Sequence, residues 1–199
     1  MELILVDKNN YKKAIEIQRM IFPKEDGALN ILASLDRDLF IEKTGLDYVD
    51  DHVKYYLAKV DDNYIGITGI YYYDSDNAWL AWFGILKEFR NNGLGRQLLR
   101  NTVSKVKTMN FKTMRLYTDF IDNKDAIKLY EEEGFVGEKY TLEELSYDCR
   151  IYSKSLINDD VDLWDNKNLN LTYQSSLDHM NRDDVDKIVE MYNEIIKKA

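Results

Sequence analysis

Three runs rich in β-branched and aromatic residues follow one another in the middle of the chain, with only short polar turns between them. The first two, VKYYLAKV and YIGITGIYYY, are joined by Asp61-Asp62-Asn63, and DSDN leads from the second into AWLAWFGIL. Turns this short connect antiparallel neighbours, because parallel strands need a crossover of a dozen or more residues. The pattern therefore predicts a three-stranded antiparallel meander at the centre of the fold.

Helical and strand patterns continue on both sides of the meander. Before it, ELILV predicts a strand, NNYKKAIEIQRMIF a helix, and GALNILASLDRDLFIEK one further helix that ends near Gly45. After it come a helix from Leu94, the strand KTMRLYTDF, the short helix NKDAIKLYEEEGF, and the strands FVGEKYTLE and YDCRIYSKSL. This order predicts a mixed α/β (α+β) fold with a mostly antiparallel sheet flanked by helices, not a doubly wound parallel sheet.

Residues 157–199 form an extension to a domain over residues 1–156. NLNLTYQ predicts an extra strand, and a final helix is indicated by apolar residues at helical spacing: Val185, Ile188, Val189, Tyr192, Ile195 and Ile196. Such a stripe is more often core packing than a partner surface. We therefore expect the extension to pack on the same domain.

Composition excludes several classes of function. The net charge of −9 argues against a general nucleic-acid binder, which needs clustered Lys and Arg. Cys149 is the single cysteine, so no internal disulfide can form, and the separated His52 and His179 give no zinc-ligand spacing, so no metal is expected. No apolar stretch reaches membrane-span length and the N-terminal run is too short for a signal peptide, so we expect a cytoplasmic protein with no membrane partner.

The segment FRNNGLGRQLL places Gly93 and Gly95 at the start of a helix, where glycine usually lowers stability. A glycine-rich turn that opens a helix is suited to bind an anion, because first-turn N–H groups converge and the helix dipole adds positive charge. The Walker A motif is excluded by Arg96-Gln97 after Gly95, and the dinucleotide fingerprint by Leu98 and by the antiparallel meander. The pattern Arg90-x-x-Gly93-x-Gly95 remains.

This pattern and the later NKDAIKLYEEEGF together resemble the GNAT superfamily of acyl-CoA-dependent N-acyltransferases. The likeness covers roughly residues 1–156 in element order, and its specific motifs lie between Phe83 and Phe135. It implies a central sheet that splays after the fourth strand. It also implies acetyl-CoA as acyl donor and a primary amine of a small molecule or peptide as acceptor, acetylated by direct attack.

The resemblance also implies roles for individual residues. Backbone groups of Phe83, Gly84 and Ile85 would pair with the pantetheine arm, with Gly84 allowing a bulge. A pyrophosphate would be held by Asn91, Asn92, Gly93, Leu94, Gly95 and Arg96, with the Arg90 and Arg96 side chains nearby. Asn123 matches a position whose side chain reaches the cofactor, although an N-cap role is the alternative. Tyr130 matches a tyrosine near the leaving thiolate, to which a phenol can give a proton; the alternative is a core aromatic.

The general base is not assigned by the sequence. Asp119, Asp74 and Asp76 are candidates, although an aspartate at such a position is more often a solvated turn residue than a base. The acceptor pocket would draw on a set of aromatic and acidic residues: Tyr55, Tyr56, Tyr71, Tyr72, Tyr73, Asp47, Asp50, Asp51, Asp74 and Asp76. Aromatic faces beside carboxylates suit an ammonium ion, which favours a cationic amine, while sheet packing explains the same residues.

Two other functions stay open at this point. The chain could be a catalytically silent sensor that binds acyl-CoA, because no base is evident. It could also be a structural or interaction protein in which the glycines only begin a helix. Homodimers are common in the superfamily, and residues 157–199 do not decide the oligomeric state.

Overall fold

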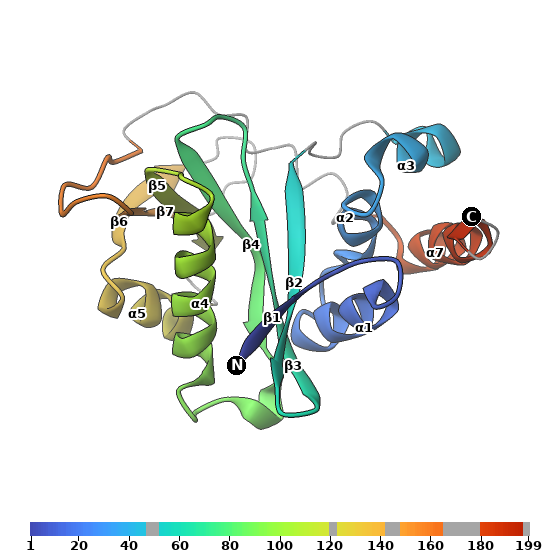
Figure 1. Cartoon of the computed structure of the whole chain (residues 1–199), viewed down its shortest axis with the longest axis horizontal. Helices are drawn as coiled ribbons and strands as arrows, with labels where there is room; N and C mark the ends of the chain where they lie inside the picture. The colour runs from blue at the N-terminus through green and yellow to red at the C-terminus, as the bar shows by residue number, and fades with distance from the viewer. Residues whose placement is uncertain (47–51, 120–122, 142–147, 165–179, 197–199) are drawn as a thin grey trace. The chain divides into compact units, whose positions relative to one another are not determined.

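The computed structural model describes residues 1–46, 52–119, 123–141, 148–164 and 180–196 (Figure 1). Its elements in chain order are β1 (Glu2–Leu5), α1 (Tyr11–Ile21), α2 (Ala28–Ala33), α3 (Arg37–Thr44), β2 (Val53–Val60), β3 (Asn63–Tyr71), β4 (Asn77–Ile85), a 3-10 turn (Lys87–Phe89), α4 (Leu94–Thr108), β5 (Thr113–Asp119), α5 (Lys124–Glu132), β6 (Val136–Thr141), β7 (Asp148–Ser155) and α7 (Arg182–Ile196). The predicted extra strand NLNLTYQ lies outside the described residues.

Seven strands form one sheet in the order β1-β2-β3-β4-β5-β7-β6. The predicted meander is confirmed, since β2, β3 and β4 are consecutive neighbours. β1 pairs with β2, and β7 with both β5 and β6, in antiparallel fashion, whereas β4 and β5 are parallel. The β4–β5 register covers only Asn77 to Trp79 on β4, while β5 stays paired with β7 along its whole length. The predicted mixed α/β fold with a mostly antiparallel sheet is therefore confirmed.

The prediction of one continuous helix over GALNILASLDRDLFIEK is wrong. The segment forms two helices, α2 and α3, because Asp36 adopts an extended backbone with φ −164° and ψ 95°. Its side chain accepts a hydrogen bond from the backbone N–H of Leu39 at 3.1 Å, which is the geometry of an N-cap. The second helix ends at Gly45, in the left-handed conformation with φ 71°, as expected.

The chain divides into two compact units, and the first comprises Met1–Gly69, Trp82–Asn92 and Leu169–Ala199. Every residue of α2 is buried in it. The predicted C-terminal helix is present as α7, which packs on α2 with Tyr192 buried and its ring 6.2 Å from that of Phe40. Arg19 on α1 joins this cluster through Asp186 of α7 at 2.7 Å.

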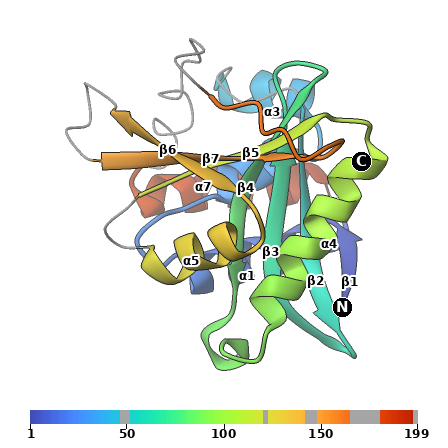
Figure 2. The ribbon, with the colours of Figure 1, turned by 90° about the vertical axis from the view of Figure 1, so that its left-hand side faces the viewer.

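The second unit comprises Ile70–Ala81 and Gly93–Asn168, and within it β5, β7 and β6 run side by side (Figure 2). Its centre is the fully buried Arg115, which donates to Asn77, Ser153 and Asp162 at 2.6–2.9 Å. The guanidinium lies 5.5 Å from the ring of Trp164. A buried arginine needs such partners, so residues 162–164 are fixed to this unit.

Candidate active site

The stretch of β4 that the resemblance assigns to the pantetheine arm follows the end of the β4–β5 pairing. Phe83 and Gly84 are half-buried and Ile85 is buried. The backbone irregularity lies at Trp82, with φ 42°, two residues before the glycine at which it was expected. Gly84 has another structural role: a Cβ there would come within 2.5 Å of Ile21 Cγ2, so the absence of a side chain lets the end of α1 pack on the strand.

The loop after β4 contains two residues in the left-handed region, Asn91 with φ 64° and Gly93 with φ 73°. Gly93 is the N-cap of α4, and it has no side chain that could cap the helix. Arg90 stabilises the beginning of this loop, because its Nε donates to the carbonyl oxygen of Ile85 at 2.8 Å. Asn91, Asn92 and Gly93 are exposed to solvent.

The space around the two glycines is open. A Cβ at Gly93 would meet no atom within 4 Å, and a Cβ at Gly95 would be 3.9 Å from Leu129 Cδ2. Close packing therefore does not explain why either residue is a glycine. The positive φ of Gly93 does explain the glycine at that position. The first-turn N–H groups of Leu94, Gly95 and Arg96 have no carbonyl partner within the helix, and this open N-terminus suits an anion.

The Arg96 side chain is directed to the end of α5. Its Nη1 lies 2.6 Å from Glu133 Oε1, and its other terminal nitrogen pairs with Glu132. Hydrogen bonds from Arg100 and Arg96 lower the pKa of Glu133, so this carboxylate is ionised at neutral pH. Both arginines that were expected near the pyrophosphate thus contact protein oxygens, Arg90 on a carbonyl group and Arg96 on carboxylates.

Asn123 precedes α5 as its N-cap, and Tyr130 lies in the last turn of the helix. Asn123 occupies the exposed N-cap position, but its side chain makes no capping hydrogen bond. Tyr130 is buried among the rings of Phe135 and Tyr152, each with its centroid 6.0 Å away. Burial raises the pKa of Tyr130 above its ordinary value, so its phenol holds a proton at neutral pH.

The aspartates considered as bases have structural partners. Asp74 Oδ1 accepts hydrogen bonds from the backbone N–H groups of Asp76 and Asn77, both at 2.7 Å. Partial burial opposes ionisation of Asp74, but its hydrogen bonds with Asn77 and Asp76 outweigh it and lower its pKa, which makes the group a weak base. Asp76 pairs with Lys112 at 3.0 Å. The Asp119 side chain lies outside the described part of the structure.

The aromatic residues proposed for the acceptor pocket divide between the two units. Tyr55 and Tyr56 are buried in the first. In the second, Tyr71 stacks on Trp79 at 6.1 Å and Tyr72 contacts Phe111 at 5.0 Å, while Tyr73 is exposed. Asp47, Asp50 and Asp51 lie outside the described residues. Sheet packing thus accounts for much of this aromatic set.

Two buried amides were not predicted from the sequence. Gln18 on α1 and Asn30 on α2 are 0% and 7% exposed, and among the described residues Gln18 Oε1, Gln18 Nε2 and Asn30 Oδ1 have no hydrogen-bond partner. Gln18 Cδ and the Trp82 indole both lie within 3.1 Å of the position that a Cβ of Gly27 would occupy. The signal in the sequence was a polar residue on the apolar face of the first helix, next to Ile17.

Within the described ranges, no group of three or more His, Cys, Asp and Glu is placed to hold a metal ion. No helix there combines the length and apolar character needed to cross a membrane. Cys149 on β7 is buried.

Comparison with known proteins identifies the family. Residues 14–135 match the acetyltransferase (GNAT) family model. A probable spermine N(1)-acetyltransferase of Bacillus subtilis subsp. natto (strain BEST195) is 26% identical over 136 residues, which cover 54% of this chain and 89% of the relative.

Solved structures share the fold. Spermidine N-acetyltransferase from Vibrio cholerae, in complex with CoA and spermine, superposes with a TM-score of 0.57 at 17% identity, over 78% of this chain and 95% of that one. Aminoglycoside 6'-acetyltransferase type Ii gives a TM-score of 0.59 at 18% identity, over 79% of this chain and 99% of the other. Since the family match spans more than half of the chain, the protein belongs to the GNAT acetyltransferase family and transfers an acetyl group from acetyl-CoA to an amine.

Proposed function

We propose that the acceptor is a small linear polycationic amine of the polyamine class. The similarity to a probable spermine N(1)-acetyltransferase carries this proposal. The net charge of −9 supports it, because a negative protein raises the local concentration of a polycation. The buried amide oxygens of Gln18 and Asn30 add hydrogen-bond acceptors that suit an amine donor.

For the acyl donor, we propose that the open N-terminus of α4 receives the pyrophosphate of acetyl-CoA. The uncapped first turn and the unfilled space at Gly93 and Gly95 support this placement. The backbone N–H groups of Asn91 to Arg96 would supply hydrogen bonds, and the helix dipole would add partial positive charge. Binding would also require Arg96 to reorient from Glu132 and Glu133 if its side chain is to reach a phosphate.

For the chemistry, we propose direct transfer. The neutral amine nitrogen attacks the thioester carbonyl carbon, the carbon–sulfur bond breaks, and the sulfur takes a proton from the phenol of Tyr130. Burial raises the pKa of Tyr130, so its phenol carries its proton at neutral pH and can donate a hydrogen bond to the departing sulfur; a proton that it gives to the sulfur is restored from solvent. The amine proton leaves to solvent or to a base that is not yet assigned.

The acceptor proposal is tested by measuring CoA thiol release by the purified chain with acetyl-CoA and a panel of amines. The panel contains spermine, spermidine, a diamine, a monoamine, an aminoglycoside and a peptide with a free N-terminus. We expect kcat/KM to rise with the charge of the linear amine, and the KM for spermine to increase with ionic strength as salt screens the attraction. Equal or better turnover of the monoamine or the peptide would contradict the proposal.

The homodimer implied by the resemblance stays a prediction. Light scattering on the purified chain, with and without spermine, would determine its oligomeric state.

A further inference from the structure

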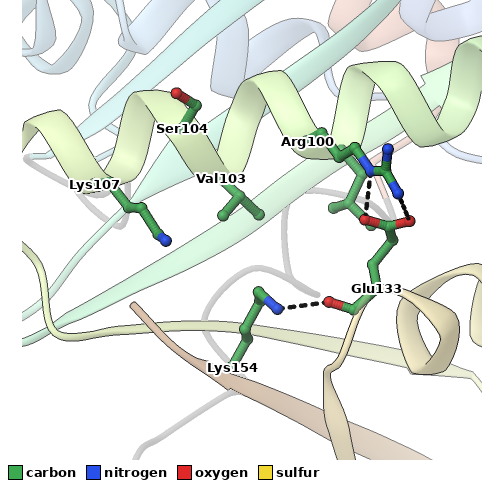
Figure 3. A pocket seen from close by; sticks show the side chains of 7 residues that line it. Arg100, Val103, Ser104, Lys107, Glu133 and Lys154 are labelled. Carbon is green, nitrogen blue, oxygen red and sulfur yellow. Dashed lines mark hydrogen bonds and ion pairs between the residues drawn. The ribbon is translucent and has the colours of Figure 1, made fainter. Parts of the chain in front are cut away.

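A groove of about 260 Å³ lies on the second unit, beside α4. We call it the α4 groove, and it is lined by Leu99, Arg100, Val103, Ser104, Lys107, Glu133 and Lys154 (Figure 3). Its residues come from α4, from the turn after α5 and from β7. None of them belongs to the set that the resemblance assigns to acetyl-CoA.

The charge of this region is opposite to that of the whole protein. The chain has 36 acidic and 27 basic residues, but α4 carries four basic residues and no acidic one. The groove itself contains three cations, Arg100, Lys107 and Lys154, and one carboxylate, Glu133. The lining therefore carries a net charge of about +2, counted from ordinary ionisation at neutral pH.

The one carboxylate is already neutralised by arginine. Arg100 donates to Glu133 through Nε at 2.8 Å and through Nη2 at 3.0 Å, and Arg96 pairs with the same carboxylate from outside the groove. Glu133 is thus paired with two guanidinium groups. Its charge therefore does not offset the charges of Lys107 and Lys154.

Both groove lysines, Lys107 and Lys154, have N–H groups that could donate to a ligand. Lys154 Nζ gives one hydrogen bond to the Glu133 carbonyl oxygen at 2.6 Å, which leaves two of its three N–H groups for other acceptors. Lys107 is exposed, and no hydrogen bond or ion pair of its side chain is found within the described ranges. Val103 gives the groove an apolar side chain between Lys107 and Arg100, and the Ser104 hydroxyl group points away from both lysines (Figure 3). Leu99 is fully buried.

We propose that the α4 groove is a binding site for a small phosphate monoester dianion. Lys107 and Lys154 would donate to the phosphate oxygens, and the organic substituent would lie on the partly exposed Val103. Two lysine charges match the charge of the dianion, and a volume of about 260 Å³, just below the usual range of ligand pockets, suits only a small ligand. The site would be separate from acetyl-CoA, so its occupancy does not depend on the acetyl-transfer reaction.

The test is calorimetric titration of the full chain, without CoA, with phenyl phosphate at a pH of about 7.5, where a phosphate monoester is mostly dianionic. We expect saturable binding at one site. Lys107→Gln should weaken it about tenfold, as expected for the loss of one charge-assisted hydrogen bond. Lys105→Gln removes the same charge from a residue of α4 that does not line the groove, and it should leave the affinity within about twofold of the parent.

Three results would overturn the proposal. The first is the absence of saturable binding to folded protein. The second is an equal loss in Lys105→Gln and Lys107→Gln, which would indicate general charge attraction. The third concerns CoA itself: Lys107→Gln binds CoA more weakly than the parent chain does, while both proteins bind dephospho-CoA equally well. That result would show that the groove holds the 3'-phosphate of CoA instead of a separate ligand.

Discussion

At the scale of single residues, Gly93 and Gly95 at the start of α4 are explained differently by the fold. Gly93 has φ 73°, which L-residues rarely adopt, so the backbone alone explains it. Gly95 has an ordinary helical backbone and open space around it, and alanine would stabilise a helix there by about 1 kcal/mol. Within the described fold no contact requires glycine at this position, which is the strongest residue-level argument that a ligand approaches it.

Gly95→Glu separates folding from binding. A glutamate in the first turn favours the helix dipole, so we expect a melting temperature equal to or above that of the parent chain. The same charge repels a pyrophosphate, so CoA should bind at least about tenfold more weakly than to the isosteric Gly95→Gln control. Calorimetry and thermal melting measure the two effects. A lowered melting temperature with unchanged affinity would mean that the glycine serves the fold.

Tyr130→Phe tests the phenol as proton donor. We expect kcat to fall by about a hundredfold, with the Kd for CoA within about twofold of the parent, since only the departing sulfur loses a partner. Tyr152→Phe is the matched control, because its ring lies in the same cluster and its hydroxyl contacts Glu131 at 3.1 Å. Equal losses of kcat in both variants would assign Tyr130 to packing.

Residue roles were predictable from the sequence only where the backbone decides them. The turn glycine Gly93 follows from its position before an apolar helix face. The contacts of Arg96 with Glu132 and Glu133 do not, because 36 or more residues separate the partners and no local pattern indicates the pairing. Likewise, the need for glycine at position 84 arises from Ile21, on a distant helix.

At the scale of elements, the break between α2 and α3 shows how one capping residue overrides a continuous apolar pattern. Apolar spacing runs through Leu35, so the segment was predicted as one helix. Asp36 instead separates two helices. In the first turn of α3 the backbone N–H of Leu39 has no carbonyl partner, and the Asp36 side chain accepts a hydrogen bond from it. An Asp followed by Arg-Asp was the available signal. The meander was easier to predict, since its turns and strands are both local.

Asp36→Ala should therefore lower the free energy of unfolding by about 1 kcal/mol, in the usual range for loss of an N-cap. Asp36→Asn retains a cap and should restore most of that stability. Glu42→Ala, which removes an acid from an exposed position of the same helix, should change stability by less than about 0.5 kcal/mol. Denaturant titrations measure all three. If Asp36→Asn is as unstable as Asp36→Ala, the contribution of Asp36 is its charge and not its cap.

At the scale of the whole molecule, the C-terminal residues stabilise structure formed much earlier in the chain. Asp26, which is 5% exposed, pairs with Arg19 at 2.8 Å and with Arg182 of α7 at 3.3 Å. Tyr11 contacts Asn193 through its hydroxyl group. The stripe of apolar residues predicted α7 correctly as a helix, but its partners could not be read from spacing, because the contacts join residues more than 150 positions apart.

The buried tyrosine of α7 makes overall stability sensitive to alkaline pH. Burial, with smaller effects of Asp36 and Tyr11, raises the pKa of Tyr192 from 10.0 to about 12. Below pH 10 the tyrosine is protonated in both the folded and the unfolded chain, and its contribution to stability is fully present. Between pH 10 and 12 the unfolded chain loses the proton first, so the free energy of unfolding should fall by about 1.4 kcal/mol per pH unit from this group alone.

Tyr192→Phe removes this ionisation. The variant should lose stability less steeply than the parent above about pH 10, while Tyr73→Phe, at a side chain that is 41% exposed, should keep the parental slope. Denaturant titrations between about pH 9 and pH 12 measure the slopes, and comparing slopes removes any constant loss of packing in the variants. Identical slopes for Tyr192→Phe and the parent chain would show that Tyr192 ionises as readily in the folded protein as in the unfolded chain, and that the contact of α7 with α3 is open to solvent at high pH.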